Sequence, residues 1–138
     1  MNDRDLIDLV LNFTQQIDEL QVKYYPLTQD SSQDTSVVFA NYKAEAEKIY
    51  LRYLTKKDRT YYIGINSPPK FAGVKSNTPS KVEHTKNGAV VTFYTNTGLL
   101  DFQFILTCKN DQWLINSFKQ RYHSDDRELT YKWQYSSF

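Results

Sequence analysis

The clearest pattern of apolar and polar positions lies in residues 99–122, where two alternating runs flank a polar pair. The period of two predicts two strands, and Asn110-Asp111 favours a tight turn between them. On the first strand, one face holds Leu100, Phe102, Phe104, Leu106 and Cys108, and the other holds Asp101, Gln103, Ile105, Thr107 and Lys109. On the second strand, Trp113 and Ile115 lie opposite Leu114, Asn116 and Phe118. Pairing Cys108 with Trp113 and Leu106 with Ile115 puts both apolar rows on one face of a long hairpin.

Two helical patterns precede this hairpin. Residues 3–24 carry apolar side chains at helical spacing, namely Leu6, Leu9, Val10, Phe13, Ile17, Leu20 and Tyr24. Asn2 or Asp3 is placed to cap this helix, and Pro26 is expected to end it. After a polar loop at 27–35, Thr35 or Ser36 is expected to cap a second helix that runs to about Leu54. Its apolar stripe is Val38, Phe39, Tyr42, Ala46, Ile49, Tyr50, Tyr53 and Leu54.

The residues between the second helix and the long hairpin predict further β-structure. Residues 60–65 read as a short strand, and 66–79 as an irregular connection with one helical turn around Phe71. Residues 81–95 predict a hairpin with a type I′ turn at Asn87-Gly88, which pairs His84 with Val91 and Val82 with Phe93. The alternation in 129–135 predicts a last edge strand, or else a tail that docks on a partner.

This element order predicts an α+β fold. Two N-terminal helices pack on one face of a curved antiparallel sheet made of consecutive hairpins. A chain of 138 residues, 40% of them hydrophobic, is long enough to bury a core, and we expect one domain over 1–138.

Composition narrows the classes of partner. With 17 basic and 16 acidic side chains the net charge is +1, which gives no bulk electrostatic attraction to nucleic acid or to an anionic membrane. Because acids are scattered through the first residues, we expect no signal peptide, and no apolar run is long enough to span a membrane. Cys108 is the lone cysteine, so no disulfide forms within the chain, and we expect a small buried side chain in a cytoplasmic protein.

Few residues suggest catalysis. His84 shares a face with apolar residues and is the one candidate base for a pocket, although a packed or hydrogen-bonded histidine is the simpler and favoured interpretation. Asp101 lies opposite the Phe102 face and is expected to be solvated. His84 and His123 lack metal-ligand spacing, and no phosphate-binding or nucleophile-elbow motif is present. We therefore expect no catalytic residues, no metal and no cofactor.

The second sheet face mixes aromatic, aliphatic and short polar groups, a composition typical of protein interfaces. Its residues, as predicted by alternation, are Thr92, Tyr94, Ile105, Leu114, Asn116, Phe118 and Tyr122. Three interpretations remain open. The face binds another protein, forms a homodimer seam, or is covered by the chain's own C-terminal strand.

The whole pattern resembles the nuclear transport factor 2-like superfamily, and most closely its bacterial immunity proteins. The resemblance rests on Phe102, Phe104 and Leu106, a polar turn, then Trp113, Ile115, Ser117 and Lys119, and on the segment KIYLRYLTKKDR before the strands. It implies a non-catalytic protein that binds the toxic domain of an effector secreted by a contact-dependent or type VI system and blocks its active site or its folding. No toxin-contact residues carry over from the resemblance.

Three hypotheses of different classes follow. The first is a toxin inhibitor that acts by occlusion, with Tyr94, Phe118 and Tyr122 as aromatic anchors. The second is an isomerase or dehydratase of the same fold, which needs His84 or Asp101 beside Tyr50 or Tyr53. The third is a homodimeric scaffold that uses the same sheet face.

Overall fold

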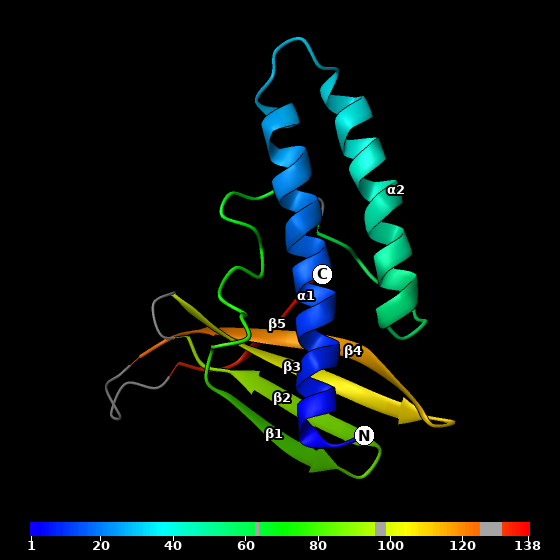
Figure 1. Cartoon of the computed structure of the whole chain (residues 1–138), viewed down its shortest axis with the longest axis vertical. Coiled ribbons are helices and arrows are strands. Elements are labelled where there is room, and N and C mark those ends of the chain that lie inside the picture. Colours follow the sequence, from blue (N-terminus) through cyan, green and yellow to red (C-terminus); the bar gives the residue numbers. More distant parts are fainter. Residues whose placement is uncertain (63, 96–98, 125–130) are drawn as a thin grey trace.

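Two helices are followed by a single antiparallel sheet (Figure 1). The computed structural model describes residues 1–62, 64–95, 99–124 and 131–138. The elements are α1 (Asp3–Thr28), α2 (Thr35–Tyr53), β1 (Ser80–Thr85), β2 (Gly88–Phe93), β3 (Leu100–Lys109), β4 (Gln112–Tyr122) and β5 (Gln134–Ser136). The strands lie in the order β1-β2-β3-β4-β5. The predicted α+β architecture is confirmed.

The two helices form an antiparallel hairpin that lies on one face of the sheet and extends beyond it (Figure 1). α1 crosses the sheet with its N-terminal half, and α2 packs beside α1. Between the helices, the rings of Tyr24 and Tyr42 meet edge to face at 5.8 Å, and Gln16 Nε2 donates to the Tyr53 hydroxyl at 2.6 Å. α1 therefore contacts both α2 and the sheet.

The helix ends differ in part from the sequence prediction. Asn2 and Asp5 form a capping box at the start of α1, as Asn2 was expected to do. The prediction that Pro26 ends the helix is wrong, because Pro26 lies in the last turn of α1. Proline has no N–H to donate to the carbonyl four residues earlier, and that carbonyl belongs to Val22, which is exposed. The cap of α2 is Asp34 rather than Thr35 or Ser36, since its carboxylate accepts from the Ser36 amide at 3.0 Å.

The β3–β4 hairpin has the predicted pairs Cys108–Trp113 and Leu106–Ile115. Its turn residues Asn110 and Asp111 both have positive φ, 53° and 60°, as a type I′ turn requires. Beyond Ile115 the register shifts, because Ile105 pairs with Ser117 and leaves Asn116 as an extra residue. This β-bulge reverses the alternation of β4.

The bulge corrects the position of Phe118. Phe118 pairs with Phe104 and shares its core face, with no exposed surface. The prediction that Phe118 lies on the face opposite Ile115 is therefore wrong. The physical reason is the inserted residue, which a strict period of two does not include.

The β1–β2 hairpin keeps the predicted faces but has another register. Thr85 pairs with Gly88, so the two loop residues are Lys86 and Asn87, and His84 pairs with Ala89 rather than Val91. Gly88 is the first residue of β2, and a Cβ there would lie 1.9 Å from the carbonyl oxygen of Leu106. The glycine at this position allows β2 and β3 to approach closely. The predicted type I′ turn at Asn87-Gly88 is wrong, because the loop residues are Lys86 and Asn87.

The outer edge of β4 is covered by two separate segments. β5 pairs with Phe118–Gln120, and the Thr55 amide donates to the Ile115 carbonyl at 3.0 Å. The predicted strand at 60–65 is wrong for the residues of it that the structure describes, where the Tyr62 amide donates to the Phe138 carbonyl at 2.7 Å and no strand forms. The predicted last strand is present as Gln134–Ser136, while Leu129 and Thr130 lie outside the described residues.

The irregular segment before β1 is joined to α1 by two partly buried hydrogen bonds. Gln21 is 1% exposed, and its Oε1 accepts from the Lys70 amide at 2.8 Å. Asp18 Oδ1 accepts from the Phe71 amide at 2.9 Å. These contacts hold the Phe71 side chain in the core, where its ring meets Phe13, Phe102, Phe104 and Phe118.

Asp18→Asn is expected to alter the pH dependence of stability. Burial raises the pKa of Asp18 to about 6, against lowering contributions from the Phe71 amide and Lys75. A raised pKa in the folded state makes folding bind a proton, so this carboxyl favours folding at low pH and loses that contribution as pH rises through about 6. The amide oxygen of Asn still accepts from Phe71, so the variant should gain about 1 kcal/mol over wild type between pH 4 and pH 7.5, after discounting for partial solvent screening.

Urea unfolding at both pH values measures this gain. Glu19→Gln removes an exposed carboxylate from the same helix and is the matched control. An equal change with pH in both variants would show that Asp18 is not the group responsible.

Gly88→Ala is expected to lower the free energy of unfolding by at least about 2 kcal/mol, because the methyl group overlaps the Leu106 backbone. Gly73→Ala is the control, since a Cβ there meets Phe102 at an ordinary 3.5 Å, and its effect should stay within about 0.5 kcal/mol. Urea denaturation compares the two. Equal stabilities would contradict the close approach of β2 and β3.

Candidate functional site

His84 does not lie in a pocket. Its side chain is 54% exposed, and its Nε2 lies 2.6 Å from Oδ1 of Asp3 in the first turn of α1. The pocket prediction is wrong because His84 lies next to the loop of the β1–β2 hairpin, where its side chain is exposed beside the first turn of α1. The simpler interpretation, a hydrogen-bonded histidine, is confirmed.

Asp101 is buried, contrary to the expectation that it is solvated. It is 1% exposed and accepts from the Thr95 amide at 2.9 Å and from Arg121 Nε at 3.1 Å. Its Oδ1 also lies 2.9 Å from Nδ1 of His123. Alternation assigned the face of β3 correctly, but it did not show that neighbouring segments supply three partners around the carboxylate.

The set required by the enzyme hypothesis is not assembled. Tyr50 and Tyr53 lie on α2, where burial raises the pKa of Tyr50 and Tyr53 accepts from Gln16. Asp101 lies on the sheet face opposite Phe102, and His84 is paired with Asp3. Among the described residues, no three His, Cys, Asp or Glu side chains converge as metal ligands.

Three of the seven residues predicted for the second sheet face are occupied within the chain. Phe118 is in the core, and Thr92 is 3% exposed and accepts from Gln103 Nε2 at 3.2 Å. Asn116, the bulge residue, accepts from Thr55 Oγ1 at 2.9 Å and, through its carbonyl, from Arg59 at 2.7 Å. Tyr94, Ile105 and Leu114 are partly buried. Tyr122 is 62% exposed, but beyond the bulge it shares the face of Phe118 and Leu100, so its predicted position on the second face is wrong.

The structure brings Tyr122 together with residues that the sequence analysis did not select. Leu99, Tyr131 and Tyr135 are all exposed, and the rings of Tyr122 and Tyr131 meet edge to face at 5.8 Å. A hollow of about 570 Å³ lies among these side chains. We call this the sheet-end surface, made of Leu99, Lys119, Arg121, Tyr122, Tyr131, Lys132, Trp133 and Tyr135.

Cations and aromatic rings are stacked on this surface. Lys119 Nζ lies 4.6 Å from the centre of the Tyr135 ring, and the Arg121 guanidinium lies 4.2 Å from Trp133. The signal in the sequence was the aromatic run at 131–135, which alternation assigned to a single strand face. In the structure the strand begins only at Gln134, so Tyr131 and Trp133 approach β4 as an irregular segment.

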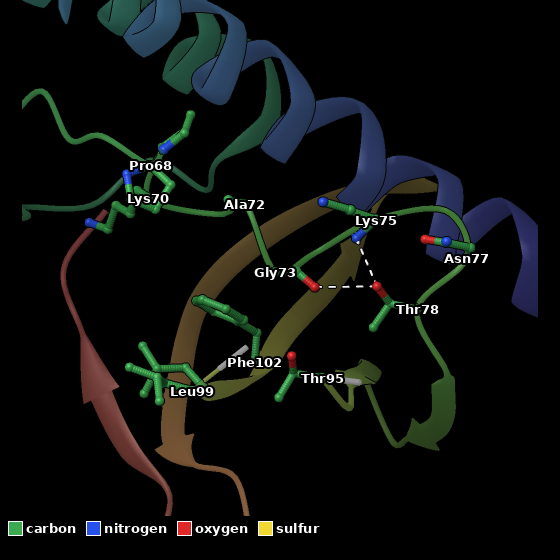
Figure 2. Close-up of a pocket in the computed structure, with 12 residues that line it drawn as sticks. Pro68, Lys70, Ala72, Gly73, Lys75, Asn77, Thr78, Thr95, Leu99 and Phe102 are labelled. Carbon is green, nitrogen blue, oxygen red and sulfur yellow. Dashed lines mark hydrogen bonds between the residues drawn. The ribbon is translucent and has the colours of Figure 1, made fainter. Parts of the chain in front are cut away.

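A second hollow of about 520 Å³ lies on the other side of Leu99 (Figure 2). Figure 2 shows Leu99 and Phe102 of the β3 region on one side, and Lys75, Asn77 and Thr78 of the loop on the other. Its loop is closed by Thr78 Oγ1, which accepts from the Lys75 amide at 3.2 Å and donates to the Gly73 carbonyl at 3.3 Å. In the part of the chain that the structure describes, no acid, histidine or cysteine lines this hollow, so these residues offer no pair for general acid–base chemistry.

Lys70 lines the second hollow but is engaged with the protein itself. Its Nζ donates to the Ser137 carbonyl and lies 4.8 Å from the centre of the Tyr62 ring and 5.4 Å from that of Phe118. Burial lowers the pKa of Lys70 to about 8. The contact holds the chain near Phe138, whose ring is 5% exposed and packs on Phe118.

Comparison with known proteins adds one finding. The model of a family described as NTF2 fold immunity protein matches residues 5–133. No curated protein and no solved structure matches the chain. Within the described residues, neither helix combines the length and the apolar character needed to cross a membrane.

Phe118→Ala and Tyr122→Ala are expected to separate the core from the surface. Removing the buried Phe118 ring should cost about 3–5 kcal/mol of unfolding free energy, whereas Tyr122→Ala should cost less than about 1 kcal/mol, since its ring is mostly in solvent. Chemical denaturation of both variants provides the comparison. A small loss for Phe118→Ala would contradict the bulge at Asn116 that places this ring in the core.

Proposed function

The chain belongs to the family of NTF2 fold immunity proteins, and from this we propose that it protects a bacterial cell by binding the toxic domain of one cognate secreted effector and occluding its active site. The observation that carries the proposal is the match of the family model to residues 5–133. An inhibitor of this kind acts in the cytoplasm of the producing cell or its sibling, the location expected from the lone cysteine.

The character of the exposed side chains supports binding rather than catalysis. Tyr, Trp and Arg are the residues that most often carry the affinity of protein interfaces, and the sheet-end surface contains all three. By contrast, His84 and Asp101 are each paired inside the chain and lie apart from Tyr50 and Tyr53. This arrangement suits a protein that acts by binding a partner over a contact surface.

Occlusion also explains how a protein without an assembled set of catalytic side chains among its described residues can neutralise an enzyme. A bound inhibitor needs only to cover the substrate path of the toxin, and its effect is limited by stoichiometry. An enzyme that repaired the toxin's damage or destroyed its product would turn over many times. The two mechanisms therefore differ in how much protein is needed.

Titration of this chain against its toxin tests the proposal. The probe is the purified toxic domain of the cognate effector, assayed on its own substrate. Inhibition is expected to be complete at one molar equivalent and proportional to the amount added below it, because each bound copy blocks one active site. An active-site variant of the toxin serves as the control, since it should still form the complex.

Two results would contradict the proposal. Protection by far less than one equivalent would indicate turnover and favour the enzyme hypothesis. Absence of any complex, measured by size-exclusion chromatography with light scattering, would remove the inhibitor mechanism. The same measurement on the chain alone shows whether it forms a homodimer.

A further inference from the structure

The sheet has one edge that no other described segment covers. β1 is the first strand in the order β1-β2-β3-β4-β5, and Figure 1 shows it at the outer edge of the sheet. Within the described residues, the backbone of β1 is hydrogen-bonded to β2 and to no other segment. Unpaired N–H and C=O groups along a sheet edge are a template for pairing with another strand.

The register of the β1–β2 hairpin shows which backbone groups point to this edge. The Tyr94 amide donates to the Pro79 carbonyl at 2.9 Å, directly before β1 begins. In an antiparallel ladder, alternate residues of a strand bond to a given neighbour. The odd-numbered residues of β1 therefore bond to β2. The residues whose N–H and C=O groups point outward are Ser80, Val82 and His84.

An apolar row of the sheet also ends at this edge. Phe118, Phe104, Val91 and Val82 are successive partners across β4, β3, β2 and β1. The first three side chains are buried, whereas Val82 is only partly buried. Val82 thus ends the row with one side open, and a further apolar side chain beside it would continue the core face.

The opposite face of β1 carries two charges of opposite sign, one on either side of Val82. Lys81 and Glu83 are both more than half exposed and form an ion pair at 2.7 Å. A lysine on an edge strand discourages pairing with most other strands. Here each charge has a match in a second β1 strand that runs in the opposite direction through Val82.

From these observations we propose that two copies of this chain pair antiparallel along β1, with Val82 opposite the partner's Val82 on a two-fold axis. In this register Lys81 lies opposite the partner's Glu83, and Ser80 lies opposite the partner's His84. The outward groups of the even-numbered residues then form about six backbone hydrogen bonds between the copies. The inference goes beyond the proposed function, because it concerns self-association at an edge that the toxin need not occupy.

Charge selects this register and this partner. Outward-pointing residues must pair with one another, so the second strand can shift only in steps of two residues. One step places Lys81 opposite the partner's Lys81, and the step in the other direction places Glu83 opposite the partner's Glu83. Like charges directly opposite each other destabilise a strand pair, and opposite charges stabilise it. All four facing charges belong to β1 itself, so the match does not depend on residues elsewhere in the chain.

The helices leave room for the second copy. The first turn of α1 lies beside β1, where Asp3 contacts His84, and α1 then runs across the sheet away from the free edge (Figure 1). A two-fold axis perpendicular to the sheet joins the two copies into one continuous sheet with the helices of both on the same face. The strands β4 and β5 lie toward the other edge and stay uncovered.

Sedimentation velocity of the whole chain over a range of concentrations tests the inference. Because paired edges bury little area, we expect a reversible dimer with Kd of about 10–100 μM. Lys81→Glu and Glu83→Lys each bring like charges face to face twice, and each should raise Kd by about 10-fold or more. Lys86→Glu is the control, since it reverses an exposed charge in the adjoining loop, and it should leave Kd within about 2-fold. Circular dichroism confirms that all variants are folded.

Mixing the two reversed variants provides the sharpest test. In an equimolar mixture of the Lys81→Glu and Glu83→Lys proteins, every acid at position 81 or 83 of one copy faces a lysine of the other. A heterodimer with Kd close to that of wild type is therefore expected, and a defect in folding could not produce this recovery. A dimer that neither reversal weakens, or a mixture that stays monomeric, would overturn the proposal.

The remaining outcomes separate this inference from the proposed function. Wild type that stays monomeric at about ten times the expected Kd overturns the pairing of β1. If the reversed variants then also fail to bind the toxin, the edge belongs to a strand of the toxin instead. A monomeric Lys81→Glu protein that still inhibits the toxin at one equivalent leaves the proposed function intact. A wild-type dimer that fails to inhibit the toxin rejects the proposed function alone.

Discussion

The single inserted residue in β4 determines how the two faces of this protein are used. Asn116 has no partner on β3, and from this point each side chain of β4 points to the face opposite to that predicted by simple alternation. Phe118 turns into the core, and Lys119 and Arg121 turn to the open face. The position of Lys119 and Arg121 on the open face and the burial of Phe118 in the core thus have one geometric origin.

The bulge is also a point of attachment. The side-chain oxygen of Asn116 accepts from Thr55, and its backbone carbonyl accepts from Arg59, so the segment after α2 is fixed against the edge of β4. Arg59 in turn lies over the Phe138 ring. A strand edge that would otherwise present unpaired backbone groups is covered here by the segment after α2 and further along by β5.

The core depends on segments that have little regular structure of their own. Phe71 enters it from an irregular loop and Phe138 from the residues after β5, and both contact Phe13 and Phe118. The loop is held by Gln21 and Asp18 of α1, at the cost of partly burying a carboxylate. In consequence, the positions of α1, the loop and the sheet are coupled, and the sheet-end surface is displayed on a fixed support. A rigid support of this kind favours tight binding, because little ordering remains to be done when a partner arrives.

The sequence alone determined whatever depends on near neighbours. The periods of two and of 3.6, the capping box at Asn2 and the Asn110-Asp111 turn involve residues a few positions apart, and they were sufficient for the α+β class and for the pairing at the tip of the central hairpin. The resemblance that pointed to immunity proteins rested on this same hairpin.

Only the tertiary structure decided the rest. The close approach of Gly88 to Leu106 accompanies the observed register of β1. The burial of Asp101 depends on its contacts with Arg121 and His123. The sheet-end surface depends on the approach of Tyr131 and Trp133 to β4. Each is a contact between residues distant in sequence, where steric fit and burial outweigh the local preferences that a pattern records.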